Sequence, residues 1–216
     1  MAASRSDTID QRVDKLIQDW AEKNTIKIVR AYTQKGGWEG WAQVEIATAL
    51  GESRDSSNYG DARDALKAIL YKTSREQPVY RPETRTTRSL LTLKRRTRVV
   101  QKRADVVIES QPPLTKEFVI VELKCEGFHN KDNFVEQVKK DIEKVKGDIK
   151  DDFKPAKAWA YAISTSEAYK EMSRLPAIRH TDLYSLPQGQ PGVKLSPDER
   201  AMNPRICLWV FEKHHK

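Results

Sequence analysis

Apolar residues recur at helical spacing along the first third of the chain. From Asp7 to Lys23 they return every three or four positions, which predicts an amphipathic helix capped by Asp7. The stretch from Ile26 to Tyr32 is short and β-branched, whereas helical patterns return from Trp38 to Leu50 and from Tyr59 to Leu70. We therefore expect residues 1–78 to form a mainly helical N-terminal part.

After position 78 the apolar residues gather in short runs of strand length. The predicted elements are, in order, adjacent strands at Ala104–Glu109 and Glu117–Cys125, a helix whose apolar stripe runs from Phe134 to Ile149, a strand at Ala158–Ile163, a short helix near Ser166–Arg174 and a strand at Ile206–Phe211. The order strand, helix, strand predicts a parallel crossover. We expect residues 79–216 to form the α/β core of a single domain that spans residues 1–216.

The composition indicates an intracellular protein that binds a polyanion. No apolar run approaches the roughly 20 residues needed to span a bilayer, and Met1 to Thr8 lacks the order of a signal peptide. The cysteines are Cys125 and Cys207, too few for a disulfide framework and without zinc-ligand spacing, so we expect reduced structural thiols. The formal net charge of +8 favours nucleic acid as the partner, although a basic surface kept for solubility is the alternative.

The positive charge is concentrated just before the first predicted strand of the core. Thr84 to Val100 is rich in threonine, valine and leucine, which favours a hairpin or strands with a cationic solvent face, and a disordered arm is the alternative. Because the cations immediately precede Asp105, we interpret them as contacts to a phosphate backbone, with a merely solvated strand face as the alternative. They are Arg81, Arg85, Arg88, Lys94, Arg95, Arg96, Arg98, Lys102 and Arg103.

Two acids and a lysine stand at the ends of the two adjacent strands. Asp105 heads the first strand, and Glu122 and Lys124 end the second on one face, because side chains alternate along a strand. In phosphodiester hydrolysis oxygen ligands hold Mg²⁺ against the phosphate, and an amine orients or deprotonates the attacking water. An exposed Glu122–Lys124 pair without a metal is the alternative. A second acid-x-lysine, Asp148-Ile149-Lys150, falls on the predicted helix.

The runs Ala104-Asp105-Val106-Val107-Ile108 and Val121-Glu122-Leu123-Lys124-Cys125 resemble the PD-(D/E)XK nuclease superfamily, over roughly the stretch from Glu45 to Ile163. The resemblance implies a restriction-endonuclease-like core, a central mixed β-sheet flanked by helices, with a metal site at the strand ends. Alanine stands where the motif's name has proline, and the metal-binding carboxylate is kept. The superfamily includes restriction endonucleases, Holliday-junction resolvases, repair nucleases and nuclease toxins, so the resemblance does not identify the substrate.

Two further residues fit roles that members of this superfamily fill. Many members place an acid on a helix before the motif, and Glu45 lies in the middle of the apolar face of the Trp38–Leu50 helix, with Glu39 at its margin. We therefore expect Glu45 to bind the metal or a water, and a structural ion pair is the alternative. Some members use Gln or Lys on the helix after the second strand, which makes Gln137 a candidate ahead of Asp141.

These interpretations combine into one expected function. The chain is expected to be an endonuclease that uses Mg²⁺ or Mn²⁺ to hydrolyse nucleic acid, DNA in preference to RNA. Asp105, Glu122 and Glu45 would hold the metal, and Lys124 and Gln137 would assist catalysis. The alternatives are a non-catalytic nucleic-acid-binding module and a structural protein on the same fold. A homodimer is compatible with the sequence.

Overall fold

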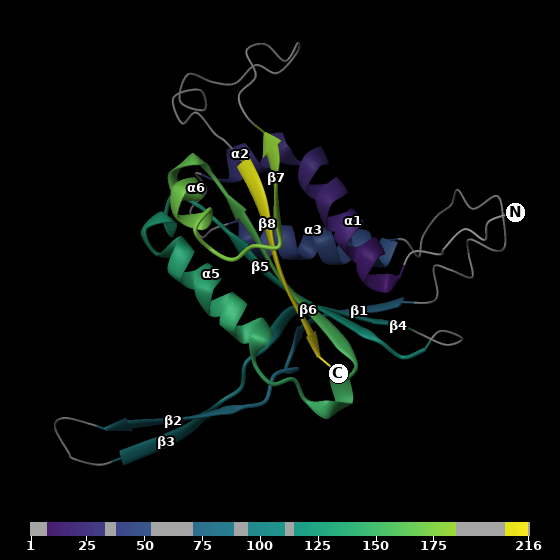
Figure 1. Cartoon of the computed structure of the whole chain (residues 1–216), viewed down its shortest axis with the longest axis vertical. Helices are drawn as coiled ribbons and strands as arrows, with labels where there is room; N and C mark the ends of the chain where they lie inside the picture. The colour runs from purple at the N-terminus through teal and green to yellow at the C-terminus, as the bar shows by residue number, and fades with distance from the viewer. Residues whose placement is uncertain are drawn as a thin grey trace, which may run out of the picture.

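A mixed β-sheet of six strands forms the middle layer of the computed structural model, which describes residues 8–32, 38–52, 71–88, 95–110, 115–184 and 206–215 (Figure 1). The strand order is β1-β4-β5-β6-β8-β7, and β5 and β6 are its one parallel pair. The strands are β1 (Tyr71–Gln77), β4 (Ala104–Ser110), β5 (Phe118–Cys125), β6 (Ala156–Ser164), β7 (Arg179–Tyr184) and β8 (Ile206–His215). The expected α/β class with a mixed central sheet is confirmed.

Helices cover both faces of this sheet. The purple and blue helices of Figure 1 lie on one face, and they are α1 (Ile9–Lys23), α2 (Thr25–Ala31) and α3 (Glu39–Glu52). The green helices α5 (Lys131–Lys146) and α6 (Ser166–Met172) pack on the other face, and a short 3-10 turn, η1 (Asp151–Phe153), precedes β6. Among the described residues no helix is long and apolar enough to span a bilayer.

Alternation along the strands divides the core into two apolar clusters. Along β6, Trp159 and Tyr161 belong to the cluster beneath α1 and α3, whereas Ala158, Ala160 and Ala162 belong to the cluster beneath α5. In the parallel register, Ala160 pairs with Glu122 and Ala162 with Lys124 on β5. Because alanine is small, the α5 face has room both for the helix and for these long polar side chains.

The central motif of the fold agrees with the sequence pattern. Strands β4 and β5 are antiparallel neighbours, and α5 carries the chain from β5 to the parallel strand β6. The threonine-rich basic stretch forms a separate antiparallel hairpin of β2 (Glu83–Arg88) and β3 (Arg95–Val100). Figure 1 shows this hairpin extending away from the sheet, beside the end of α5. The predictions of a hairpin and of a crossover are therefore confirmed.

Three elements differ from the sequence pattern. The β-branched stretch near Ile28 and Val29 is the helix α2, in which both side chains pack into the core with α1. The sequence predicts neither β1 nor β7, because these polar edge strands lack a regular apolar alternation. Strand β1 also belongs to the sheet although it lies inside residues 1–78, the part expected to be mainly helical.

Element boundaries also shift. Thr8 rather than Asp7 is the N-cap of α1, and its backbone N–H donates to Gln11 Oε1 at 3.0 Å. Strand β8 continues through His214 and His215, two residues that the sequence places in a mobile terminus. The predicted helix at Tyr59–Leu70 lies outside the described residues.

The segment Asp148–Lys150 is not helical, because α5 ends at Lys146. Instead, Lys150 N–H donates to the carbonyl of Val79 and Arg81 N–H to that of Asp148, each at 2.9 Å. Tyr80 forms an antiparallel bridge with Ile149 between these two bonds. The base of the hairpin is thereby fixed beside the C-terminal end of α5.

Candidate active site

Asp105 and Glu122 face each other where β4 and β5 separate. Val106 of β4 pairs with Val121 of β5 at the end of the antiparallel ladder, and Asp105 and Glu122 are the residues just beyond this pair on each strand. The backbone N–H of Leu123 donates to Asp105 Oδ2 at 2.7 Å. This bond fixes the Asp105 carboxylate against the backbone between Glu122 and Lys124, so the structure brings together the three residues of the sequence motif.

The Glu122 carboxylate is almost fully buried, with 1% of its surface exposed. The hydroxyl of Tyr80 donates to Oε1 at 2.6 Å, and the ammonium of Lys144 lies 2.5 Å from Oε2. Lys144 also lies over the ring of Tyr80, with its nitrogen 5.4 Å from the ring centroid. Both oxygens of Glu122 are therefore paired, as burial of a carboxylate requires.

The Lys124 ammonium lies between two carboxylates, one from helix α3 and one from helix α5. Glu39, in the first turn of α3, places Oε1 2.9 Å from Lys124 Nζ, and Asp141 of α5 places Oδ2 3.8 Å from it. The backbone N–H of Cys125 donates to Glu39 Oε2 at 3.4 Å. Asp141 Oδ2 is buried and accepts no hydrogen bond among the described residues. Lys124 thus points into a pocket of carboxylates rather than into bulk water.

Burial, joined at Glu122 by the charge of Asp105, disfavours the charged forms of the two motif carboxyls. Burial raises the pKa of Asp105 to about 6, although the Leu123 N–H and the charge of Lys144 lower it. Burial, followed by the charge of Asp105, raises the pKa of Glu122 to about 8 against the lowering effects of Lys144 and Tyr80. Without an added cation, two ionised carboxylates therefore share this site at a cost.

Burial and the neighbouring charges also shift the pKa values of Lys124, Asp141 and Tyr80. Burial lowers the pKa of Lys124, but the charges of Asp141 and Glu39 outweigh it, so its pKa rises and the ammonium stays charged. Burial raises the pKa of Asp141, and burial together with the charge of Glu122 raises the pKa of the Tyr80 hydroxyl. Tyr80 therefore remains a hydrogen-bond donor.

Glu39, and not the expected Glu45, is the acid of α3 that contacts the motif residues. Glu45 is half-buried on α3, and among the described residues no hydrogen bond or ion pair joins it to Asp105, Glu122 or Lys124. Six residues along a helix correspond to about 9 Å, and the α3 acid that contacts Lys124 lies in the first turn of that helix. An apolar stripe shows which face of a helix packs, but not which turn reaches the site.

Helix α5 contributes Asp141 and Lys144 rather than Gln137. Gln137 lies one turn before Asp141, is half-buried, and has no hydrogen bond to the cluster within the described ranges. Gln137 is expected from the sequence ahead of Asp141, and Lys144 and Tyr80 are not among the residues expected at the site. Spacing offers a signal for Lys144, since residues 137, 141 and 144 share one face at i, i+4 and i+7.

Three basic residues at the hairpin base have described side chains. Arg81 pairs with Asp151 at 2.9 Å, Lys102 pairs with Glu83, and Arg103 donates to the carbonyl of residue 76 at 3.1 Å. Further cations of the stretch have backbone positions in β2 and β3, while their side chains lie outside the described part of the structure: Arg85, Arg88, Arg95, Arg96 and Arg98. Lys94 lies outside the described residues.

The backbone register of the hairpin pairs arginine positions with one another. Arg85 pairs with Arg98, and Arg88 pairs with Arg95. Like charges at paired positions destabilise an isolated hairpin. The repeated arginines are therefore not explained by hairpin stability alone.

Cys125 faces away from this cluster. It is buried with Leu123 in the apolar cluster beneath α1 and α3, opposite to Lys124. Burial raises the pKa of its thiol well above the ordinary value. This agrees with the expected structural role.

The carboxylates of the cluster are the type of ligand that a hard divalent cation prefers. Asp105, Glu122, Glu39 and Asp141 offer carboxylate oxygens, which Mg²⁺ and Mn²⁺ prefer as ligands. Within the part of the chain that the structure describes, however, no three Asp, Glu, His or Cys side chains already form a metal-binding group. A cation at Glu122 would compete with Lys144, whose ammonium already pairs with Oε2.

Comparisons of this chain with protein-family models, curated proteins and solved structures find no match. Its function is therefore inferred from the residues and geometry of the site.

Proposed function

We propose that this chain is a metal-dependent nuclease with a restriction-endonuclease-like core, which hydrolyses phosphodiester bonds in DNA in preference to RNA. One observation carries the proposal. Asp105 binds the backbone N–H of Leu123, between Glu122 and Lys124, so two carboxylates and an amine meet at the ends of β4 and β5. The mixed sheet with helices on both faces is the architecture that the superfamily resemblance implies.

Asp105 and Glu122 are the residues that would hold the metal ion. When bound, Mg²⁺ would neutralise charge on the phosphate and lower the pKa of a water molecule. The raised pKa values of about 6 and about 8 supply a driving force for cation binding, because an added cation relieves the repulsion between the two carboxylates. Lys144 meets this need in part through its ion pair with Glu122.

Lys124 would orient the attacking water and offset the negative charge that develops on the phosphate. Its ammonium stays charged because Asp141 and Glu39 raise its pKa, which suits charge stabilisation better than proton abstraction. Glu39 and Asp141 act as positioning residues, since each holds the Lys124 ammonium from a different helix.

A non-catalytic nucleic-acid-binding protein is the second candidate. It is favoured by the pairing of Glu122, whose two oxygens are already satisfied by Tyr80 and Lys144 without a metal ion. Such a protein would keep the basic hairpin and bind phosphates, while the buried cluster would only stabilise the fold.

Incubation of the purified protein with circular DNA, linear DNA and RNA, each in Mg²⁺, Mn²⁺ or EDTA, separates the candidates. The nuclease proposal expects cleavage that requires the metal ion. Binding to nucleic acid without cleavage in any metal would favour the second candidate. Absence of both binding and cleavage would reject both.

A further inference from the structure

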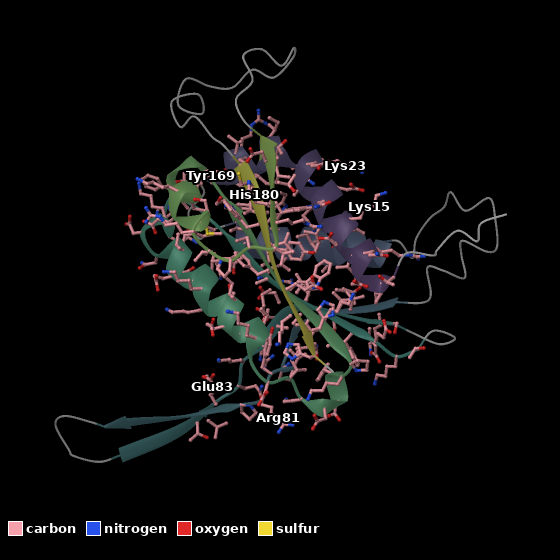
Figure 2. All side chains as sticks on the ribbon, viewed as in Figure 1. Lys15, Lys23, Arg81, Glu83, Tyr169 and His180 are labelled. Carbon is pink, nitrogen blue, oxygen red and sulfur yellow. The ribbon has the colours of Figure 1, made fainter. Side chains whose placement is uncertain are left out.

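A groove lies between helix α5 and the base of the β2–β3 hairpin. Its volume is about 580 Å³, and both walls carry cations. Lys102 and Arg103 line it from the strand side, and Lys139, Lys140 and Lys144 from α5. Figure 2 labels Glu83, another lining residue, at the start of the hairpin.

Most of the acids that line the groove are already neutralised. Glu83 pairs with Lys102, and Glu136 pairs with Lys139 at 2.5 Å. A third lining acid, Glu143, pairs with Lys146 at 2.9 Å. The net positive charge of the groove therefore comes from the cations that form no ion pair with a carboxylate.

Two such cations line the groove from its opposite walls. Arg103 donates to a neutral backbone carbonyl, that of Glu76, at 3.1 Å. Lys140 forms no ion pair with any carboxylate in the described ranges, and its neighbour Glu136 is bound by Lys139. Both Arg103 and Lys140 are exposed, so their charges are available to a ligand.

The groove is continuous with the candidate active site. Asp141 and Lys144 line the groove and also contact Lys124 and Glu122, respectively. Arg103 precedes Asp105 by two residues on the chain. A chain of phosphates held between the two walls would therefore lead toward the motif carboxylates.

The size of the groove favours one strand over two. Its volume of about 580 Å³ lies within the range of about 300–1,000 Å³ that encloses a drug-sized molecule, which corresponds to one or two nucleotides. A duplex, whose major groove alone is about 12 Å wide, would have to stay outside.

We propose that this groove binds a single-stranded segment of nucleic acid, with Arg103 and Lys140 each holding a phosphate. The proposal takes its ligand class from the proposed nuclease function.

The test measures binding in EDTA, where no metal-dependent cleavage occurs. Fluorescently labelled single-stranded DNA, single-stranded RNA and duplex DNA of equal length are titrated with the wild type and with the double variant R103Q/K140Q at several salt concentrations. The matched control is K15Q/K23Q, which removes two exposed lysines of α1, on the other face of the sheet (Figure 2). Thermal unfolding checks that each variant is folded.

We expect R103Q/K140Q to bind single strands on the order of tenfold more weakly than the wild type. Its salt dependence should flatten by roughly 1.4 units of slope, at about 0.7 for each lost phosphate contact on a single strand. Duplex binding should change no more than in K15Q/K23Q. Equal losses of single-strand affinity in both double variants, an equal or greater loss on duplex, or no single-strand binding by the wild type would overturn the proposal.

The outcome is separable from that of the nuclease proposal. If the wild type cleaves in Mg²⁺ but R103Q/K140Q binds single strands like the wild type, the groove assignment fails and the nuclease proposal stands. If single-strand binding depends on Arg103 and Lys140 but no metal supports cleavage, the groove assignment stands and the nuclease proposal fails. Comparison of the affinities for single-stranded DNA and single-stranded RNA shows which nucleic acid the groove prefers.

Discussion

The ammonium of Lys144 lies 2.5 Å from the carboxylate of Glu122, so a lysine of α5 neutralises the acid that the proposed function assigns to a metal ion. A lysine and a divalent cation cannot both occupy the same side of a carboxylate. Lys144 is therefore expected to stabilise the metal-free protein and to compete with the metal.

Replacement of Lys144 by glutamine tests this competition. In EDTA above pH 8, where the carboxyl of Glu122 is ionised, the variant should lose about 1–3 kcal/mol of unfolding free energy, because Glu122 is left buried without its cation. Mg²⁺ should then raise the unfolding temperature of K144Q more than that of the wild type. The control is K146Q on the same helix, where an exposed surface pair is lost and the change should stay below about 1 kcal/mol. Equal behaviour of K144Q and K146Q would count against the competition.

The stability of the metal-free protein should fall as the pH rises. Asp105 and Glu122 have ordinary pKa values of 3.8 and 4.5, and folding raises them to about 6 and about 8. The folded state thus binds these protons more tightly than the unfolded state, and the resulting stability is complete below the unfolded values and lost as the pH rises through the folded ones. A difference of one unit between the folded and the unfolded pKa of a group corresponds to about 1.4 kcal/mol of unfolding free energy.

The measurement is denaturant unfolding in EDTA between pH 5 and pH 8. The unfolding free energy of the wild type should decrease across this range. E122Q should show a flatter profile, because glutamine cannot titrate and the raised pKa of Glu122 no longer contributes to the pH dependence. A wild-type protein that becomes more stable from pH 5 to pH 8, or an E122Q profile as steep as that of the wild type, would contradict the raised pKa values of the two carboxyls.

Two acids of the same helix give a matched comparison. E39Q should lose about 1 kcal/mol of stability and reduce cleavage by roughly tenfold or more, because Lys124 loses the carboxylate 2.9 Å away that positions it. E45Q should leave cleavage unchanged and stability within about 0.5 kcal/mol. Cleavage rates and thermal unfolding of both variants check this. A larger loss of cleavage in E45Q than in E39Q would restore Glu45 as the helix acid of the site.

Replacement of Arg95, Arg96 and Arg98 by alanine tests the hairpin. All three lie on β3, and Arg98 pairs in register with Arg85 of β2. Binding of DNA should weaken, and its salt dependence should flatten by about one unit of slope for each lost phosphate contact. Fluorescence anisotropy at several salt concentrations measures both quantities. An unchanged slope would assign the arginines to another role.

Local sequence pattern predicts the centre of this fold because its strands are apolar and continuous. The runs around Asp105 and Glu122 have the length and composition of strands, and the helix between β5 and β6 shows its packing stripe directly. Edge strands β1 and β7 carry too few apolar residues for the same signal, and α2 forms because tertiary packing overrides a β-branched composition.

The site is predictable to the extent that it lies on one pair of strands. Alternation places Glu122 and Lys124 on one face, and the antiparallel neighbour supplies Asp105. Tyr80 and Lys144 come from a loop and from a helix end, whose positions depend on how the hairpin base pairs with the segment after α5. Such positions follow from tertiary contacts rather than from spacing along the chain.

Metal-dependent cleavage that requires Glu122 tests the nuclease proposal most directly. Cleavage of single-stranded and double-stranded circular DNA is measured with the wild type, E122Q and E45Q in Mg²⁺, Mn²⁺ and EDTA, beside DNA binding and thermal unfolding of each protein. We predict that the wild type cleaves only with metal, that E122Q loses about a thousandfold or more while it still binds DNA, and that E45Q cleaves like the wild type. Wild-type cleavage by E122Q, undiminished cleavage in EDTA, or no cleavage of DNA or RNA by the wild type would contradict the proposal.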